Sequence, residues 1–265
     1  MSFWDHLEEL RWVILRSVIA LVVFVIIGFA FMPYIFDNII MAPSQSDFFL
    51  YKYLCKLSSV TSLIPDFCGD DFKVNIINIK LASQFMRHIS ASFWFAVIFT
   101  CPYLLFELWK FISPALYENE KKSIRWVFMF GGVMFVIGCC VGYAIVFPIT
   151  LRFLASYELS PTIVNQISLD SYMDNFVMLV FIMGLMFELP LVSWLLSQLG
   201  FLKKSFFHKY RRYAVVILLI VAAIITPSGD PFTLMVVFLP VYLLYEFSAL
   251  FVKKDVKEPE EDNDE

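Results

Sequence analysis

Two clusters of charged residues in this chain carry side chains that could bind a basic ligand. The first, HLEELR at residues 6–11, lies just before the first apolar run, and the second, ENEKK at residues 118–122, follows a turn between two later apolar runs. Carboxylates bind guanidinium groups through paired, charge-assisted hydrogen bonds. Two carboxylates at separate points can distinguish a pair of arginines from a single one, so Glu9 and Glu120 are candidates for such recognition.

Simpler explanations exist for both clusters. The segment 111–122 can be a solvated loop that only marks topology, and Glu9 can be an acidic residue near the positive end of a helix dipole. The run from His6 to Glu9 also invites comparison with a metalloprotease motif. The second histidine of His-Glu-x-x-His is absent, however, so that chemistry is dismissed.

A single carboxylate, Glu188, lies deep inside an apolar run. An ionisable side chain in the middle of a membrane span costs ~2.5–3.5 kcal/mol on insertion scales, so such residues usually serve a function. The alternative is a protonated acid that faces a neighbouring helix. Glu107 and Glu246 lie nearer the ends of their runs, where long side chains reach water, and are expected to be mainly interface residues.

The composition places these residues in a membrane protein. Of the 265 residues, 60% are hydrophobic and 18% are aromatic, which is more apolar surface than a soluble chain of this length could hide. We expect an all-α polytopic membrane protein with a single membrane domain, residues 1–252, and a charged, disordered cytoplasmic tail, residues 253–265. No cleavable signal peptide is expected, because the first apolar run is too long for one.

Six apolar runs are predicted to be transmembrane helices. They are Trp12–Pro33, Phe85–Leu108, Ile124–Ala155, Tyr172–Gln198, Tyr213–Ile225 and Phe232–Val252, with a long polar external loop at residues 34–83. The third run would reach ~48 Å as a helix, so it must tilt, bend or project, and Pro148 is the expected kink site. The fifth run would reach only ~20 Å, which predicts that helices 5 and 6 form a short hairpin.

Lysine and arginine residues predict the orientation of these helices. Fourteen of the twenty lie in the amino-terminal segment, in the second-to-third and fourth-to-fifth connections, and in the tail. The positive-inside rule assigns those segments to the cytoplasm. Both termini and both acidic clusters are therefore expected on the cytoplasmic face.

Two of the five cysteines lie in the predicted external loop. A disulfide can join Cys55 and Cys68 if that loop faces an oxidising space; alternatively both are unpaired thiols. Cys101, Cys139 and Cys140 lie inside apolar runs, where cysteine usually behaves as a small hydrophobic residue. No cysteine or histidine spacing indicates a metal site.

Four motifs together resemble the TatC family, the multispanning subunits of the twin-arginine protein translocase. They are HLEELR at residues 6–11, FISPALY at residues 111–117 followed by Glu120, FELP at residues 187–190, and Thr226-Pro227 followed by Asp230. Their order and spacing match the family up to about Val252. The long external loop with its two cysteines, and Ser228-Gly229 in the last turn, depart from the family pattern.

The resemblance implies a core subunit and receptor that binds the twin-arginine signal peptides of folded passenger proteins. The residues that it assigns to signal-peptide binding are Glu9, Arg11, Phe111, Pro114, Leu116, Tyr117 and Glu120. It also implies a partly wetted concave surface in the bundle, with Glu188 as its intramembrane polar site. Export from the bacterial cytoplasmic (inner) membrane would be driven by the proton gradient.

The resemblance further implies partners of the TatA and TatB type, which are single-span proteins, and a homo-oligomer within a larger complex. The expected docking place is the short hairpin, with Val215, Ile217, Asp230, Val237, Tyr242 and Glu246 as its candidate residues. Alternatively, helices 4 and 6 shield the fifth helix, and it recruits nothing. No cofactor and no nucleic acid is expected.

Two other classes of function fit the sequence less well. A secondary transporter of a small solute or ion would usually show internal repeats and paired intramembrane charges, whereas one deep carboxylate stands alone and no repeat is evident. An intramembrane enzyme would need an aspartate pair, a serine–histidine or serine–lysine arrangement, or a metal motif at depth. Neither these nor a Walker-type glycine loop is present, so the chain is not expected to be an enzyme.

Overall fold

The computed structural model describes residues 3–58, 74–113, 118–157, 159–160, 165–198, 202, 204–226 and 229–252. Several predictions lie outside that part of the chain. They concern Cys68, Pro114, Leu116 and Tyr117, the turn residues Pro227 and Ser228, and the tail 253–265. Glu120 is described as part of a helix, but its side chain is not.

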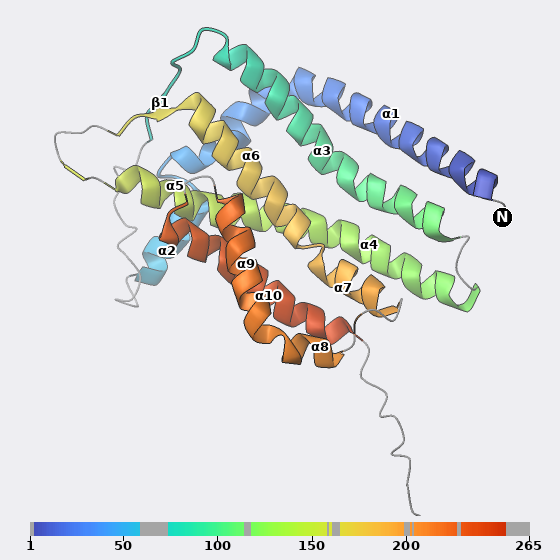
Figure 1. Ribbon diagram of the computed structural model, residues 1–265. Helices are drawn as coiled ribbons and strands as arrows, with labels where there is room; N and C mark the ends of the chain where they lie inside the picture. The colour runs from blue at the N-terminus through green and yellow to red at the C-terminus, as the bar shows by residue number, and fades with distance from the viewer. Residues whose placement is uncertain are drawn as a thin grey trace, which may run out of the picture.

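The described chain is mostly helical, as expected. Its longer helices are α1 (Phe3–Ile35), α3 (Ser83–Ile112), α4 (Glu118–Val141), α6 (Leu169–Met186), α9 (Arg211–Ile225) and α10 (Pro231–Phe251). The shorter elements are η1 (Phe36–Ile40), η2 (Ala42–Ser44), α2 (Phe49–Ser58), β1 (Ile76–Ile77), η4 (Gly142–Val146), α5 (Phe147–Ser156), β2 (Ile167–Ser168), α7 (Leu189–Gln198) and α8 (Lys204–Lys209). Figure 1 shows this arrangement.

Among the described residues, five helical segments are long and apolar enough to cross a membrane. They are His6–Ser44, Ser83–Ile112, Arg125–Ser156, Leu169–Gln198 and Pro231–Leu250. This confirms a multi-pass helical membrane protein. The predicted fifth span corresponds to α9, which has 15 residues and would be ~22 Å long. Because α9 is shorter than a bilayer is thick, a sixth span stays a prediction.

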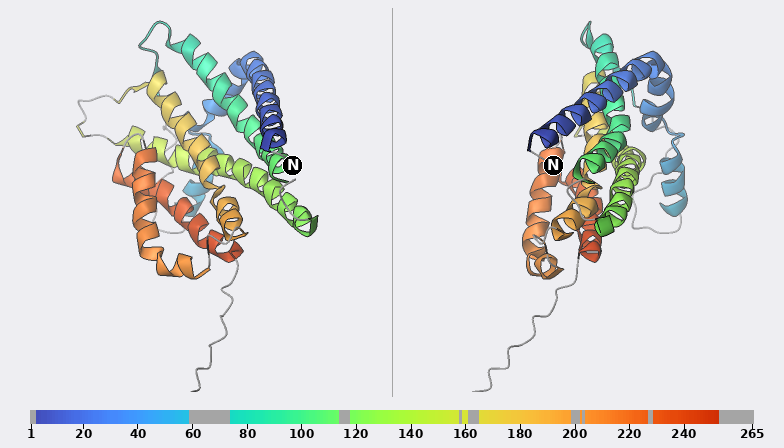
Figure 2. Two further views of the ribbon diagram at one scale, coloured as in Figure 1. Left: turned by 45° about the vertical axis from the view of Figure 1, so that its right-hand side comes forward. Right: turned by 90° about the vertical axis from the view of Figure 1, so that its right-hand side faces the viewer.

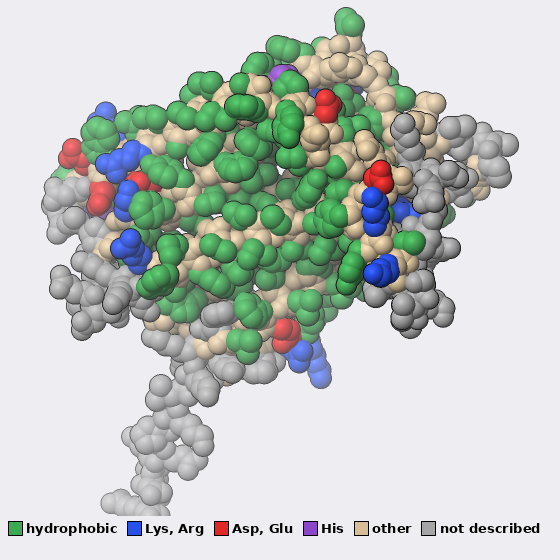
Figure 3. Space-filling view, turned by 180° about the vertical axis from the view of Figure 1, so that it is seen from behind, with side chains coloured by type: hydrophobic (Ala, Val, Ile, Leu, Met, Phe, Trp, Pro, Cys, Tyr) green, Lys and Arg blue, Asp and Glu red, His purple; other side chains and the backbone are tan. Residues whose placement is uncertain are grey.

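The helices pack into one bundle around the α4–α6 contact. α1 lies along α3, α3 lies along α4, and α7 and α9 each contact α10. Figures 1 and 2 show that α1 and α3 run side by side in opposite directions. The space-filling view in Figure 3 shows hydrophobic side chains across the middle of one face and charged side chains toward its two ends, as a lipid-facing surface requires.

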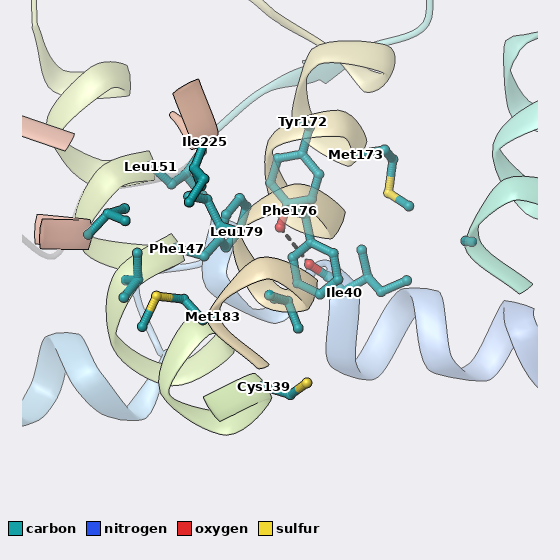
Figure 4. Packing of buried hydrophobic residues seen from close by; sticks show 14 of the residues in the cluster. Ile40, Cys139, Phe147, Leu151, Tyr172, Met173, Phe176, Leu179, Met183 and Ile225 are labelled. Atoms are coloured by element: carbon teal, nitrogen blue, oxygen red, sulfur yellow. Dashed lines mark hydrogen bonds between the residues drawn. The ribbon is translucent and has the colours of Figure 1, made fainter. Parts of the chain in front are cut away.

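The core lies where α5 and α6 meet the end of η1. Phe147, Tyr172, Leu179 and Met183 are almost completely buried there (Figure 4). The Tyr172 hydroxyl donates a hydrogen bond of 2.5 Å to the Ile40 carbonyl oxygen. This contact ties the end of the first span to the fourth.

The third span is irregular close to the predicted kink site. α4 gives way to the π-helical turn η4, and Pro148 is the second residue of α5. Proline cannot donate the backbone hydrogen bond to the residue four positions earlier, and a π-helical turn accommodates that loss. The irregularity therefore precedes Pro148 and occupies a full turn.

The fourth span is broken, which the sequence analysis did not predict. α6 ends before Phe187, and α7 begins at Leu189. Pro190 cannot bond back to Met186, and the Glu188 amide instead reaches the Leu185 carbonyl oxygen at 3.1 Å. Glu188 therefore lies at an interruption of the helix and not within a continuous one.

The predicted polar loop at residues 34–83 contains regular elements in its described part. They are η1, η2, α2 and β1, and β1 pairs in parallel with β2, with Ile76 opposite Ile167. Tyr51 anchors α2: its hydroxyl lies 2.8 Å from the Pro43 carbonyl oxygen and 3.1 Å from that of Pro148. Burial raises the pKa of Tyr51 well above its usual range. These hydrogen bonds of Tyr51 join α2 to η2 and to α5.

Candidate functional site

The structure brings the amino-terminal cluster to the end of α3. The His6 ring on α1 stacks on the Phe111 ring on α3, with centroids 4.2 Å apart and an interplanar angle of 23°. The start of α4, which contains Glu120, lies at the same end of the bundle (Figure 1). The two acidic clusters therefore share one end of the molecule, as the positive-inside argument predicted.

Glu9 is half-buried at this end, one turn after His6 on α1. Its Oε2 atom is buried and has no hydrogen-bond partner in the described structure. Arg11, by contrast, is exposed. A buried carboxylate oxygen without a partner is costly, so Glu9 is suited to accept a hydrogen bond from an incoming cation.

Glu107 is the residue that the sequence analysis misjudged. It is 1% exposed, so it does not reach water from the end of its helix. Its Oε1 lies 2.7 Å from Lys110 Nζ, and its Oε2 lies 3.5 Å from Arg16 Nη1. The i,i+3 spacing to Lys110 was visible in the sequence, but only the packing of α1 on α3 reveals Arg16.

Glu188 lies at the break between α6 and α7, facing α4. Both of its carboxylate oxygens are buried without a hydrogen-bond partner among the described residues. A Cβ atom added at Gly131 would lie 3.0 Å from Glu188 Oε2, so the glycine leaves the space that the carboxylate occupies. Within the described part of the chain, Glu188 thus has neither a hydrogen-bond partner nor an ion pair, and its role stays a prediction.

The hairpin residues differ in how accessible they are. Ile217 on α9 is exposed and Val215 is half-buried, but Val237 on α10 is 0% exposed, so its predicted contact with a partner does not fit the structure. Successive side chains point in different directions around a helix, and Val237 lies on the side of α10 that packs against the core. Asp230 accepts a hydrogen bond of 2.7 Å from the Thr233 amide and caps α10.

Tyr242 and Glu246 hold α9 against α10. Glu246 Oε1 lies 2.6 Å from Arg211 Nε, and the Tyr242 hydroxyl donates to the same carboxylate oxygen at 2.8 Å. Arg211 Nε also lies 3.1 Å from the Tyr242 hydroxyl. These two predicted docking residues therefore have an internal role at the start of α9.

Two apolar cavities lie along α3 and α4. One, of about 340 Å³, lies between the two helices, with Trp109 and Arg125 among its lining residues. The other, of about 320 Å³, adds residues of α1 and α6, and both are lined by Pro102 and Val136. Most of the residues that line the two cavities are apolar. In the described chain, no three His, Cys, Asp or Glu residues are grouped as metal ligands would be.

Comparisons with known proteins agree with this arrangement. The family model for Sec-independent protein translocase protein (TatC) matches residues 5–240. The TatC of Blattabacterium sp. subsp. Periplaneta americana is 33% identical over 249 residues, covering 94% of this chain and 93% of the relative. The TatC of Helicobacter pylori strain 26695 is 35% identical over 190 residues, covering 72% and 74%.

Two solved structures are also similar. A crystal structure of the twin arginine translocase receptor TatC superposes with a TM-score of 0.71 at 28% identity, covering 93% of this chain and 97% of the other. A crystal structure of the same receptor in DDM gives a TM-score of 0.74 at 28% identity, covering 94% and 99%. The similarity therefore extends over nearly the whole fold and over the end that carries Glu9.

Proposed function

This chain belongs to the TatC family of Sec-independent protein translocases, and we propose that it is the receptor subunit that binds twin-arginine signal peptides. In this proposal, Glu9 and Glu120 each accept one guanidinium group of the paired arginines. Arg11, Phe111, Pro114, Leu116 and Tyr117 complete the site. The passengers are folded proteins exported from the cytoplasm.

The observation that supports this proposal most directly is the unpartnered Oε2 atom of Glu9. A guanidinium group presents several N–H donors in a planar fork, which matches a carboxylate. Binding it would satisfy the oxygen and add a charge-assisted hydrogen bond. The His6 ring, which stacks on the Phe111 ring, lies one turn before Glu9 on α1.

The apolar part of the signal peptide would continue along α3 and α4. The two cavities there begin near Arg125 and pass Pro102 and Val136. Export would then require single-span partners of the TatA and TatB type, further copies of this chain, and the proton gradient. Both termini would face the cytoplasm, because the positive-inside rule assigns the segments rich in lysine and arginine to that side.

The test is a binding measurement with the purified protein in lipid nanodiscs. Fluorescence anisotropy would compare a labelled twin-arginine signal peptide with its Lys-Lys counterpart. We expect preferential binding of the Arg-Arg peptide, and Glu9→Gln should weaken that binding by at least about tenfold, or ~1.4 kcal/mol. The control is Asp47→Asn, which removes an exposed carboxylate paired with Lys52 in the 34–83 segment. Equal affinity of Glu9→Gln and the unmodified protein would refute the proposed role of Glu9.

A further inference from the structure

Two basic residues, Arg16 and Lys110, lie along the same α1–α3 contact as Glu9. Arg16 follows Glu9 by seven residues, which is two turns on one helix face, or about 10.5 Å. Lys110 directly precedes Phe111, whose ring stacks on His6. Because the two helices are antiparallel, Glu9 lies between the His6–Phe111 stack and the ion pair of Arg16. A carboxylate in this position would ordinarily attract one of these cations.

Neither cation is paired with Glu9. Arg16 Nη1 lies 3.5 Å from Glu107 Oε2, and Lys110 Nζ lies 2.7 Å from Glu107 Oε1. The Arg16 and Lys110 side chains are 52% and 44% exposed, whereas that of Glu107 is 1% exposed. The cations are thus on the surface, and the buried carboxylate directs where they lie. In the same region, Glu9 Oε2 stays without a partner.

We infer that Glu107 determines the affinity of the signal-peptide site by keeping Arg16 and Lys110 away from Glu9. A receptor carboxylate that is already paired with an internal cation must lose that partner before it binds an incoming guanidinium group. Glu107 supplies an alternative partner for both cations, so Glu9 stays open. Glu107 is therefore a positioning residue and not a further ligand of the paired arginines.

The inference rests on the proposed function, and a charge-removal series tests it with the same peptide assay. Glu107→Gln should release both cations, which then compete for Glu9, and the affinity for the Arg-Arg peptide should fall about tenfold. Adding Arg16→Gln and Lys110→Gln to Glu107→Gln removes the competing cations. We expect this triple variant to recover the affinity of the unmodified protein to within about threefold.

The recovery separates this role from a purely structural one. If Glu107 only stabilised the α1–α3 contact, the triple variant would bind as weakly as Glu107→Gln or more weakly, and that result would overturn the inference. An undiminished affinity of Glu107→Gln would overturn it as well. If Glu107→Gln does not fold, as judged by thermal unfolding, the triple variant is compared with the unmodified protein instead, and an affinity more than about threefold weaker overturns the inference.

A matched control and a reference measurement complete the design. Asp174→Asn removes a carboxylate that pairs with Arg87 between α3 and α6, at the other end of α3. It should leave the peptide affinity unchanged, and a loss as large as that of Glu107→Gln would show a general effect of broken interhelical ion pairs and contradict the inference. If the unmodified protein does not prefer the Arg-Arg peptide, the proposed function fails. If it does prefer that peptide and the series shows no recovery, only the inference fails.

Discussion

Three carboxylates of this protein illustrate how differently one chemical group is used. Among the described residues, Glu9 has a buried oxygen without a partner, Glu107 is paired with two cations, and Glu188 has no hydrogen-bond partner for either oxygen. Pairing stabilises a buried charge, and its absence is costly. The unpaired carboxylates are therefore the ones expected to act on other molecules, and Glu107 is the one expected to organise its surroundings.

Glu120 provides a second test at the residue scale. Glu120→Gln or Glu120→Ala should weaken binding of an Arg-Arg signal far more than binding of a Lys-Lys signal, since only guanidinium groups bind a carboxylate bidentately. Losing one hydrogen bond to a charged group should cost ~1.5–3 kcal/mol. Titration of both peptides measures the difference, with Glu118→Gln as the control in the same segment. Raised salt should weaken the remaining binding only partly, and an unchanged Arg-Arg affinity would remove Glu120 from the site.

Among the elements, the contact between α4 and α6 depends on close approach of two backbones. A Cβ atom at Gly138 would lie 2.6 Å from the Met183 carbonyl oxygen and 2.7 Å from Phe187 Cβ. Helices in membranes use such small residues to pack closely. The sequence shows where glycines such as Gly138 occur, but nothing in the residues around them shows which glycines face another helix.

Gly138→Ala should therefore destabilise the fold. Overpacking typically costs about 1–3 kcal/mol, and the backbone on the far side of this contact cannot move without shifting the helix break. Thermal unfolding in detergent measures the effect. Gly132→Ala is the matched control on the same helix, because its Cβ would lie at an ordinary 3.5 Å from Pro102 Cβ. Equal melting temperatures for the two variants would show that α4 and α6 are less tightly packed than described.

The short hairpin of α9 and α10 is the element proposed to recruit partners. Its ~22 Å first helix leaves a hydrophobic mismatch that another short helix could share. Cysteines introduced at Ile217 and Leu243, which are 58% and 66% exposed, should form crosslinks to single-span partners in membranes. A cysteine at the buried Val237 should not. If neither exposed position forms crosslinks while exposed positions of α1 do, the partners dock elsewhere on the protein.

At the scale of the whole molecule, the orientation in the membrane decides which chemistry each end meets. Cys55 on α2 is disulfide-bonded, and Cys101, Cys139 and Cys140 are free. A disulfide persists in an oxidising space, which supports the proposal that α2 lies on the side opposite the cytoplasm. In the proposed orientation the Glu9 end, at the other end of the bundle, faces the cytoplasm, where signal peptides are made.

Thiol counting tests this orientation together with the predicted Cys55–Cys68 bridge. Alkylation of the denatured protein without reductant should modify three thiols, and five after reduction. Closing a loop of about 14 residues should contribute ~3 kcal/mol to stability in the chain-entropy model, so Cys55→Ser should lower the melting temperature. Modification of five thiols without reductant would reject the bridge and remove this support for the orientation.

The sequence by itself determined the class of the protein, the position of its apolar runs and the residues of its acidic clusters. These follow from composition and local pattern, because a lipid environment requires long apolar helices and makes isolated charges energetically costly. Sequence also indicated the family through motifs in fixed order. It predicted the hairpin from length alone and assigned the buried Val237 to partner docking, since the residues around Val237 are apolar on all sides of the helix and carry no amphipathic signal.

The tertiary structure alone decided which charges meet. Arg16 and Glu107 are 91 residues apart, and no local pattern connects residues on different helices. The break before Glu188, the anchoring of α2 by Tyr51 and the open oxygen of Glu9 likewise depend on neighbours from other elements. Local sequence sets which segments enter the membrane, whereas the packing of one helix on another sets which buried carboxylate is satisfied and which remains available to a ligand.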